Sequence, residues 1–228
     1  MKFTAIIPAR EGSKGIPGKN LKLLCGKPLI QWTIEIAIKS PFIDKIIVST
    51  ESVQIAKIAK DLGAEVPFLR PKNLAEDSSK IIDVIIYYLK KLPKIDNFIL
   101  MQPTSPIREL IDIKNLVDLE KRYKTHSVAT VVEHKKHPYL MYSITNDMKL
   151  KAYLECSNSS NRQSYPNVYL LNGSLYLSKR SFILENKTLV NENTIASIMP
   201  PDRSIDIDNM QDWQQAASII KRDMIKYL

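Results

Sequence analysis

The chain contains 228 residues, 44% of them hydrophobic and 25% charged, a composition typical of one globular domain with a substantial buried core. Its formal net charge of +9 fits either an anionic ligand or a lysine-rich composition. The cations are spread along the chain without interleaved aromatic residues, so we expect no nucleic-acid partner. Apolar runs are too short to span a bilayer and no export signal is recognisable, so we expect a cytoplasmic protein without a membrane partner.

Cysteine and histidine spacing argues against a structural metal or a disulfide framework. Cys25 and Cys156 lie far apart in the sequence, as expected for a protein of a reducing compartment. His134 and His137 have a spacing compatible with a metal, but no cysteine or third histidine lies near them in the sequence. We therefore expect no zinc site.

Strand-like and helix-like segments alternate through the first half of the chain. Apolar, β-branched runs predict strands at residues 3–7, 45–49, 97–101 and 127–133, with a short one at 65–69. Helical periodicity predicts helices at residues 29–39, 53–62, 81–91 and 111–123. This alternation predicts an α/β fold with a mostly parallel sheet and right-handed crossovers.

The pattern changes after Glu133. Residues 134–168 are rich in tyrosine, asparagine and serine without helical periodicity, which predicts a β-rich insertion, read as a protruding arm. A strand and turn are expected over 168–177, with Asn172 and Gly173 as a tight turn. Further elements are a helix at 178–185, a strand at 194–199 and a helix at 210–226. Neither repeats nor linkers are visible, so residues 1–228 are interpreted as one domain with an insertion.

A basic, glycine-rich segment follows the first expected strand. Residues 8–20 contain three glycines and three cations, Arg10, Lys14 and Lys19. Such a loop can wrap a polyphosphate, because glycine permits close approach of backbone N–H groups and the cations supply countercharge. It follows neither of the commoner nucleotide-loop patterns. The alternative is a solvated basic loop.

Two other polar segments follow expected strands. In Gln102–Pro106, two prolines fix a turn from which Gln102 can present its amide; the alternative is a helix-entry turn capped by Thr104 or Ser105. In residues 204–208, extended backbone would place Asp206 and Asp208 on one face, a pair suited to Mg²⁺ together with phosphate oxygens. The alternative there is that Asp208 caps the last helix and that Asp206 is merely exposed to solvent.

Together these segments indicate a site for a metal–nucleoside triphosphate. In order along the chain they resemble the CMP-sialic acid synthetases (N-acylneuraminate cytidylyltransferases). The resemblance rests on residues 7–10, 13–17 and 19–20, on Arg70-Pro71 with Leu74-Ala75 and Asp77, on 102–106, on Arg162-Gln163, on Asn172-Gly173 with Tyr176, and on 204–208.

The resemblance implies a Rossmann-like (GT-A-like) three-layer fold and a Mg²⁺- or Mn²⁺-dependent transfer of CMP from CTP to a nonulosonic acid, releasing diphosphate. Arg10 and Lys19 would hold the triphosphate and stabilise the leaving group. The implied nucleotide-binding residues are Ala9, Arg10, Ser13, Lys14, Lys19, Asn20, Arg70 and Ser79. Ser78 is a neighbour in a segment shorter than the family pattern, so which serine meets the nucleotide stays open.

The resemblance also implies the sugar side, the metal ligands and the assembly. Asp206 and Asp208 would coordinate the metal. Arg162 would reach the site of a second subunit from the arm at 134–168, which implies a homodimer. The implied sugar-binding residues are Gln102, Arg162, Gln163, Tyr176 and Asn172.

Two departures from the sialate pattern concern the sugar. Leu140 stands where sialate enzymes tend to carry a lysine, and residues 188–190 replace paired phenylalanines of the acyl-amino pocket. These changes favour legionaminic acid over N-acetylneuraminate. The alternatives are another 2-keto-3-deoxy sugar acid, pseudaminate or octulosonate, or a nucleotide-binding module without catalysis.

Overall fold

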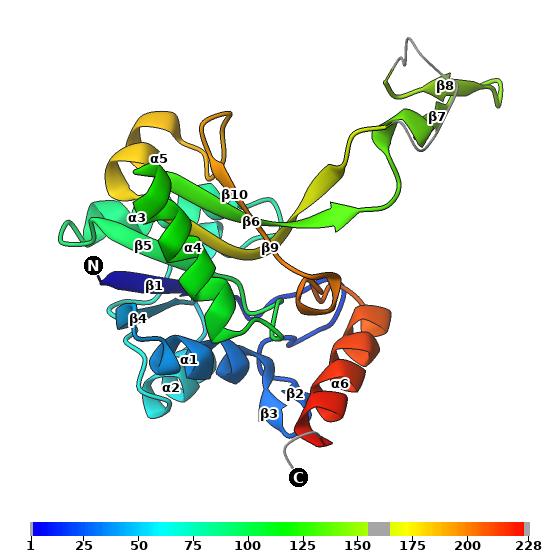
Figure 1. Ribbon diagram of the computed structural model, residues 1–228. Helices are drawn as coiled ribbons and strands as arrows, with labels where there is room; N and C mark the ends of the chain where they lie inside the picture. The colour runs from blue at the N-terminus through cyan, green and yellow to red at the C-terminus, as the bar shows by residue number, and fades with distance from the viewer. Residues whose placement is uncertain (1, 155–164, 226–228) are drawn as a thin grey trace.

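A six-stranded sheet in the order β10–β6–β9–β5–β1–β4 forms the centre of the computed structural model, which describes residues 2–154 and 165–225 (Figure 1). Only β9 runs antiparallel to its neighbours. The strands are β1 (Phe3–Pro8), β4 (Ile43–Ser49), β5 (Asn97–Met101), β6 (Ser127–His134), β9 (Val168–Lys179) and β10 (Ile195–Ile198). The prediction of a mostly parallel α/β sheet is therefore confirmed.

Helices cover both faces of this sheet because side chains alternate along its strands. In β1, Phe3, Ala5 and Ile7 join one buried cluster, whereas Ile6 joins the other. The first cluster is covered by α1 (Leu29–Lys39), α2 (Val53–Asp61) and α4 (Leu110–Tyr123). The second is covered by α3 (Ile81–Lys91) and α5 (Arg180–Asn186). The result is the expected three-layer arrangement.

A third apolar cluster lies beside the sheet and is built around α6 (Met210–Ile225). Trp213 of α6 packs there with Ile16 of the first loop and with Ile205 and Ile207 of the aspartate segment. Burying side chains of this size contributes roughly 1.5–3 kcal/mol each. This cluster therefore holds together two polar segments that are nearly two hundred residues apart. A small hairpin, β2 (Leu23–Leu24) with β3 (Lys27–Pro28), was not predicted.

Two local predictions were wrong. The segment at 65–69 forms only an isolated bridge between Glu65 and Ile47. Asn172 and Gly173 do not form a hairpin turn but lie in a bulge inside the single long strand β9. Along the β6–β9 pair, Ala129 faces Tyr176 whereas Val131 already faces Leu171, so the residues between them bulge out. Gly173 has φ +71° there, a conformation that glycine adopts without strain.

An arm extends from the far ends of β6 and β9, away from the body of the molecule (Figure 1). It contains a short 3₁₀ helix, η2 (Pro138–Leu140), and a hairpin of β7 (Tyr142–Ile144) and β8 (Leu150–Ala152). Large apolar side chains on the hairpin are exposed, among them Ile144 at 64% and Leu150 at 70%. The expected β-rich excursion is thus present in the described part of residues 134–168.

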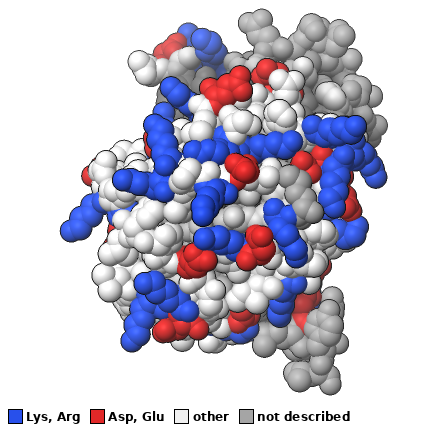
Figure 2. All heavy atoms as spheres, turned by 90° about the vertical axis from the view of Figure 1, so that its left-hand side faces the viewer, with Lys and Arg blue, Asp and Glu red and all other residues white. Residues whose placement is uncertain are grey.

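The surface of the body carries mixed charge. On the face shown in Figure 2, Lys and Arg side chains are interspersed with Asp, Glu and uncharged residues. Among the described residues, no helix is long and apolar enough to cross a membrane.

Candidate nucleotide-binding cleft

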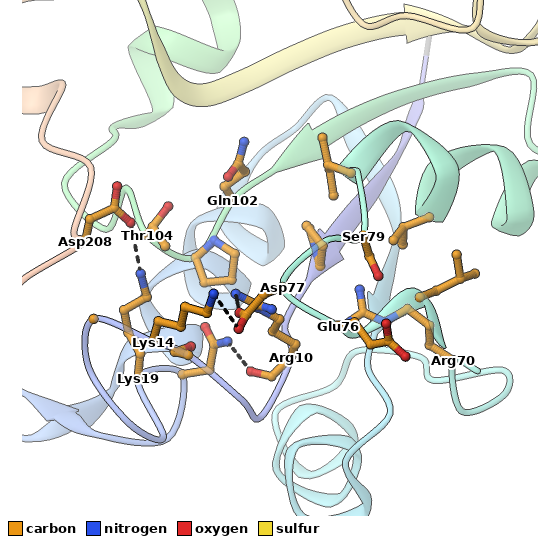
Figure 3. Close-up of a pocket in the computed structure, with 18 residues that line it drawn as sticks. Arg10, Lys14, Lys19, Arg70, Glu76, Asp77, Ser79, Gln102, Thr104 and Asp208 are labelled. Carbon is orange, nitrogen blue, oxygen red and sulfur yellow. Dashed lines mark hydrogen bonds and ion pairs between the residues drawn. The ribbon is translucent and has the colours of Figure 1, made fainter. Parts of the chain in front are cut away.

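A cleft of about 480 Å³ opens at the carboxyl ends of β1 and β5, where ligands bind in open parallel sheets (Figure 3). Its walls come from the loop after β1, the segment between β4 and α3, the turn after β5 and the aspartate segment. The residues singled out from the sequence that line it are Arg10, Ser13, Lys14, Lys19, Asn20, Arg70, Ser79, Gln102 and Asp208.

The first loop and the aspartate segment meet at one wall of the cleft. Lys19 is 8% exposed, and its Nζ lies 3.3 Å from Asp208 Oδ1 while donating to the carbonyl oxygen of Ile207. Gly15 lies against the same backbone: a Cβ placed there would be 1.9 Å from the Asp208 carbonyl oxygen. The loop can approach so closely only because residue 15 has no side chain.

The other two loop cations pair with Asp77, from the segment before α3. Arg10 Nη2 lies 2.8 Å from Asp77 Oδ1, and Lys14 Nζ lies 3.2 Å from Asp77 Oδ2. Desolvation acts to raise the pKa of Asp77, but hydrogen bonds and charge from Lys14 and Arg10 lower it below its usual value. Asn20 fixes the loop from within, because its Nδ2 donates to the Arg10 carbonyl oxygen at 2.8 Å.

Arg70 is held by a carboxylate that sequence reasoning missed. Its Nη2 donates to Glu51 Oε2 at 2.9 Å, and Glu51 Oε1 accepts the backbone N–H of Glu11 at 2.7 Å. Both side chains of the ion pair are largely buried, so the pair joins the segment before η1 (Lys72–Leu74) to the first loop. Glu51 follows β4 directly, and its position after a parallel strand was the available signal.

Ala9 lies beneath the cleft and not on its wall. Its side chain is fully buried, and its N–H donates to the Ser49 carbonyl oxygen at 2.9 Å. The contribution of Ala9 is therefore to continue the pairing of β1 with β4 up to the start of the loop.

The Gln102–Pro106 turn is fixed from below by Arg108, another residue that sequence reasoning missed. Arg108 is 4% exposed and donates to the carbonyl oxygens of Gln102 and Ser105. Burial lowers the pKa of its guanidinium to about 9, and nearby Asp112 and Asp206 oppose that shift, so the group stays charged at neutral pH. The alternative in which Thr104 or Ser105 caps the next helix is wrong, since Glu109 and Asp112 form the capping box of α4.

The aspartate segment is anchored at both ends. Arg203, in η4 (Pro201–Arg203), makes a bidentate contact to Asp112 at 2.9 and 3.0 Å, and the Ile207 N–H donates to the Thr104 carbonyl oxygen at 2.8 Å. Asp208 does not cap α6: the side chain of Asn209 accepts N–H groups of its first turn, and Asp212 accepts the Asp208 N–H. The alternative in which Asp208 caps the last helix is therefore wrong.

Asp206 faces the bulge of β9. A Cβ on Gly173 would lie 3.2 Å from Asp206 Oδ2 and 3.7 Å from Gln102 Nε2, so the two side chains converge on this glycine. The Asp206 carboxylate is accessible to water, yet surrounding protein raises its pKa, first by desolvation and then through the charge of Asp208. Tyr176 is largely buried nearby, and its pKa is raised by burial and by Asp206.

The remaining residues of the expected sugar side differ in placement. The Asn172 amide is fully used: its oxygen accepts from Thr130 Oγ1 and the Ser174 N–H, and its nitrogen donates to Ser204 Oγ and Met199 Sδ. It therefore fixes the bulge. Arg162 and Gln163 lie outside the described residues. Leu140 is 37% exposed in the arm, and Leu189 is buried in the second cluster.

Comparison with known proteins agrees with this geometry. The family model described as cytidylyltransferase matches residues 4–185. The chain belongs to the cytidylyltransferase family. The match begins at β1 and ends in α5, so it includes the first loop, the Arg70 segment, the Gln102 turn and the bulge.

Relatives of this cytidylyltransferase are named for nonulosonic acids. The chain is 39% identical over 221 residues to CMP-N,N'-diacetyllegionaminic acid synthase of Legionella pneumophila, with 93% of this chain and 94% of that protein covered. It is 32% identical over 218 residues to N-acylneuraminate cytidylyltransferase of Escherichia coli, covering 96% of this chain but 52% of that protein. The chain thus spans about half the length of the latter relative.

The fold is shared with a more distant solved structure. CMP:2-keto-3-deoxy-manno-octonic acid synthetase complexed with CTP superposes with a TM-score of 0.74 at 15% identity, over 98% of this chain and all of that one. At this identity the likeness concerns the fold, and it agrees with the nucleotidyltransferase arrangement expected from the sequence.

Proposed function

We propose that this enzyme transfers CMP from CTP to a nonulosonic acid of the N,N'-diacetyllegionaminic type. The observation that carries the proposal is the meeting of the basic first loop with the aspartate segment in one cleft. It is supported by similarity, over 93% of the chain, to a protein named for that product. In the reaction, the anomeric oxygen of the sugar forms a bond to the α-phosphorus of CTP. The bond from that phosphorus to the oxygen bridging the α- and β-phosphates breaks. Pyrophosphate leaves with this oxygen, and the hydroxyl proton passes to solvent.

The nucleotide is assigned to the first loop and the walls next to it. Arg10, Lys14 and Lys19 all line the cleft and offer countercharge for the triphosphate, which would stabilise the negative charge that develops on the leaving group. The cytosine is assigned to the wall that contains Arg70, whose guanidinium is held by Glu51. Ser79 lines the cleft, whereas Ser78 is absent from its lining, so Ser79 is the serine proposed to meet the nucleotide.

A divalent cation is assigned to Asp206 and Asp208. Among the described residues no cluster of three or more acidic, histidine or cysteine side chains forms a self-sufficient metal site. The two carboxylates nevertheless fit Mg²⁺ or Mn²⁺, since such ions use one or two carboxylates plus phosphate oxygens and waters. Desolvation is the main cause that raises the pKa of Asp206, and the charge of Asp208 adds to it, so a bound cation would stabilise the ionised carboxylate. Such an ion would polarise the α-phosphate.

The sugar is assigned to the part of the cleft lined by Gln102, next to Asp206 and the bulge of β9. Gln102 presents a rigidly mounted amide, because Arg108 holds the backbone on which it stands. Asp206 lies beside the bulge, and Tyr176 of the same strand is largely buried near Asp206.

The arm is assigned to a homodimer. It projects from the body with large apolar side chains exposed, a surface that a second copy of the chain would cover (Figure 1). In this assembly Arg162 is proposed to enter the sugar site of the neighbouring subunit.

The test is pyrophosphate release from CTP and Mg²⁺ with a panel of sugar acids: N,N'-diacetyllegionaminate, N-acetylneuraminate, pseudaminate and the octulosonate. We expect the highest kcat/KM with diacetyllegionaminate, and activity with CTP well above that with ATP, GTP or UTP. A clear preference for N-acetylneuraminate would refute the sugar assignment. Absence of release with every acid would refute the proposed reaction.

A further inference from the structure

Asp77 forms ion pairs with two of the three loop cations that line the cleft. Its two carboxylate oxygens contact different partners, Oδ1 at 2.8 Å from Arg10 Nη2 and Oδ2 at 3.2 Å from Lys14 Nζ, as Figure 3 shows. Arg10 also donates through Nη1 to the Ala75 carbonyl oxygen at 3.4 Å. Residues 75–77 thus fill the positions that oxygens of a bound phosphate would take on these two side chains.

The other cations of the cleft do not relieve this competition, because each has its own partner. Lys19 is held by Asp208 and Ile207, and Arg70 by Glu51. A polyphosphate that needs Arg10 and Lys14 must therefore displace Asp77 or lie beside its negative charge. Both routes lower the affinity for the polyphosphate, by an amount set by two partly exposed ion pairs.

The geometry points to Asp77 as an internal competitor for the polyphosphate. Asp77 would thereby determine how tightly the first loop holds the triphosphate of CTP and the pyrophosphate product. This inference rests on the proposed function for the identity of the ligand. When pyrophosphate forms, Asp77 offers Arg10 and Lys14 a partner within the chain, so the cations return to it as the product leaves. The expected consequence is weaker pyrophosphate binding and less product inhibition than the same cleft would show without this carboxylate.

Glu76 provides a matched control. It is the neighbouring acidic residue, and it lines the same cleft. Among the ion pairs of the described residues, those of Arg10 and Lys14 are made with Asp77 and not with Glu76. Replacing Glu76 by Gln therefore removes an equal charge from the same wall without freeing the two cations.

The experiment measures binding of pyrophosphate and of CTP by titration calorimetry to the full chain and to its D77N, D77E and E76Q variants, with unfolding temperatures recorded for each. D77N should bind pyrophosphate about three- to tenfold more tightly than the unsubstituted protein, since exposed pairs of this kind have modest worth. E76Q should change the affinity by less than about twofold, and D77E, which keeps the charge, should stay near the unsubstituted protein. In turnover assays, the inhibition constant of pyrophosphate should fall in D77N in parallel.

Pyrophosphate affinity in D77N that is unchanged or weaker would overturn the inference, as would equal gains in D77N and E76Q. These outcomes are distinguishable from failure of the proposed function. Absent turnover with every sugar acid, alongside tighter pyrophosphate binding in D77N, would refute the reaction and leave the competitor role standing. Normal turnover with no effect of D77N would do the reverse.

Discussion

The cleft and the arm differ in how their side chains are satisfied. In the cleft, charged groups are paired within the chain: Lys19 with Asp208, Arg70 with Glu51, and Arg10 with Asp77. In the described part of the arm, by contrast, large apolar side chains stand open to solvent on a thin hairpin. The described walls of the cleft thus come from one chain, whereas the arm exposes the apolar surface for which we propose a partner. Separate substitutions in each region can test this division.

The largest effect is expected from D206N in the cleft. Turnover should fall by about 100-fold or more, because the proposed metal site loses one of its two carboxylates. The measurement is pyrophosphate release over a range of Mg²⁺ concentrations. D202N is the control, since Asp202 lies in the same stretch but pairs with Arg222 at 3.7 Å. Equal activity in D206N and the unsubstituted enzyme would remove Asp206 from the site.

D206N is expected to lower turnover but not the stability of the folded protein. The pKa of Asp206 is raised in the folded protein, so the folded state binds the proton more tightly than the unfolded one. Stability from this group is present below its ordinary pKa and is lost as the pH rises through the raised value. At neutral pH the ionised carboxylate therefore opposes folding, and D206N should melt no lower than the unsubstituted protein in a metal-free scan. A clear drop in its melting temperature at neutral pH would contradict this sign.

The second effect concerns the contact between the first loop and the aspartate segment. G15A should lower CTP affinity or turnover by about tenfold or more, because a Cβ at this position would lie 1.9 Å from the Asp208 carbonyl oxygen and must push the two segments apart. Gly12 supplies the control: a Cβ there meets no atom within 4 Å, so G12A should remain close to the unsubstituted enzyme. Steady-state kinetics in CTP for both variants make the comparison.

Secondary-structure elements were predicted correctly from the sequence where a short window of residues defines them. Helices α1 and α3 and strand β5 have the expected bounds, because periodicity and flanking prolines define them within a short window. The bulge at Asn172–Gly173 was mistaken for a turn, because the chain continues as one strand only through pairing with β6 on both sides of the bulge and with β5 beyond it. Local propensity cannot represent that long-range pairing.

The site followed the same rule. Residues in glycine- or proline-marked loops after strands were recognisable, and they line the cleft. Glu51 was missed because its role depends on the Glu11 N–H, 40 residues away in the sequence. The acceptors of Arg108 are within six residues, but the sequence does not show that its side chain folds back beneath the turn. Asp77 was recognised only as part of a motif. Its pairing with Arg10 and Lys14 emerges when loops 60 or more residues apart are brought to one wall.

The smallest effect on turnover, and the one that tests the arm, is expected from a double substitution in its hairpin. Ile144 pairs with Leu150 across β7 and β8, so both side chains lie on one face, exposed at 64% and 70%. I144E with L150E places two charges where a second copy of the chain is proposed to pack, which should convert a dimer to monomer in analytical ultracentrifugation. Turnover should then fall by about three- to tenfold, because the proposed contribution of the partner to the sugar site is lost while the nucleotide wall is untouched.

Ser143 lies on the other face of the hairpin, so S143E should keep the oligomeric state. A dimer that persists in the double variant would show that the exposed face serves another purpose, and the arm would no longer contrast with the cleft as an interface between copies.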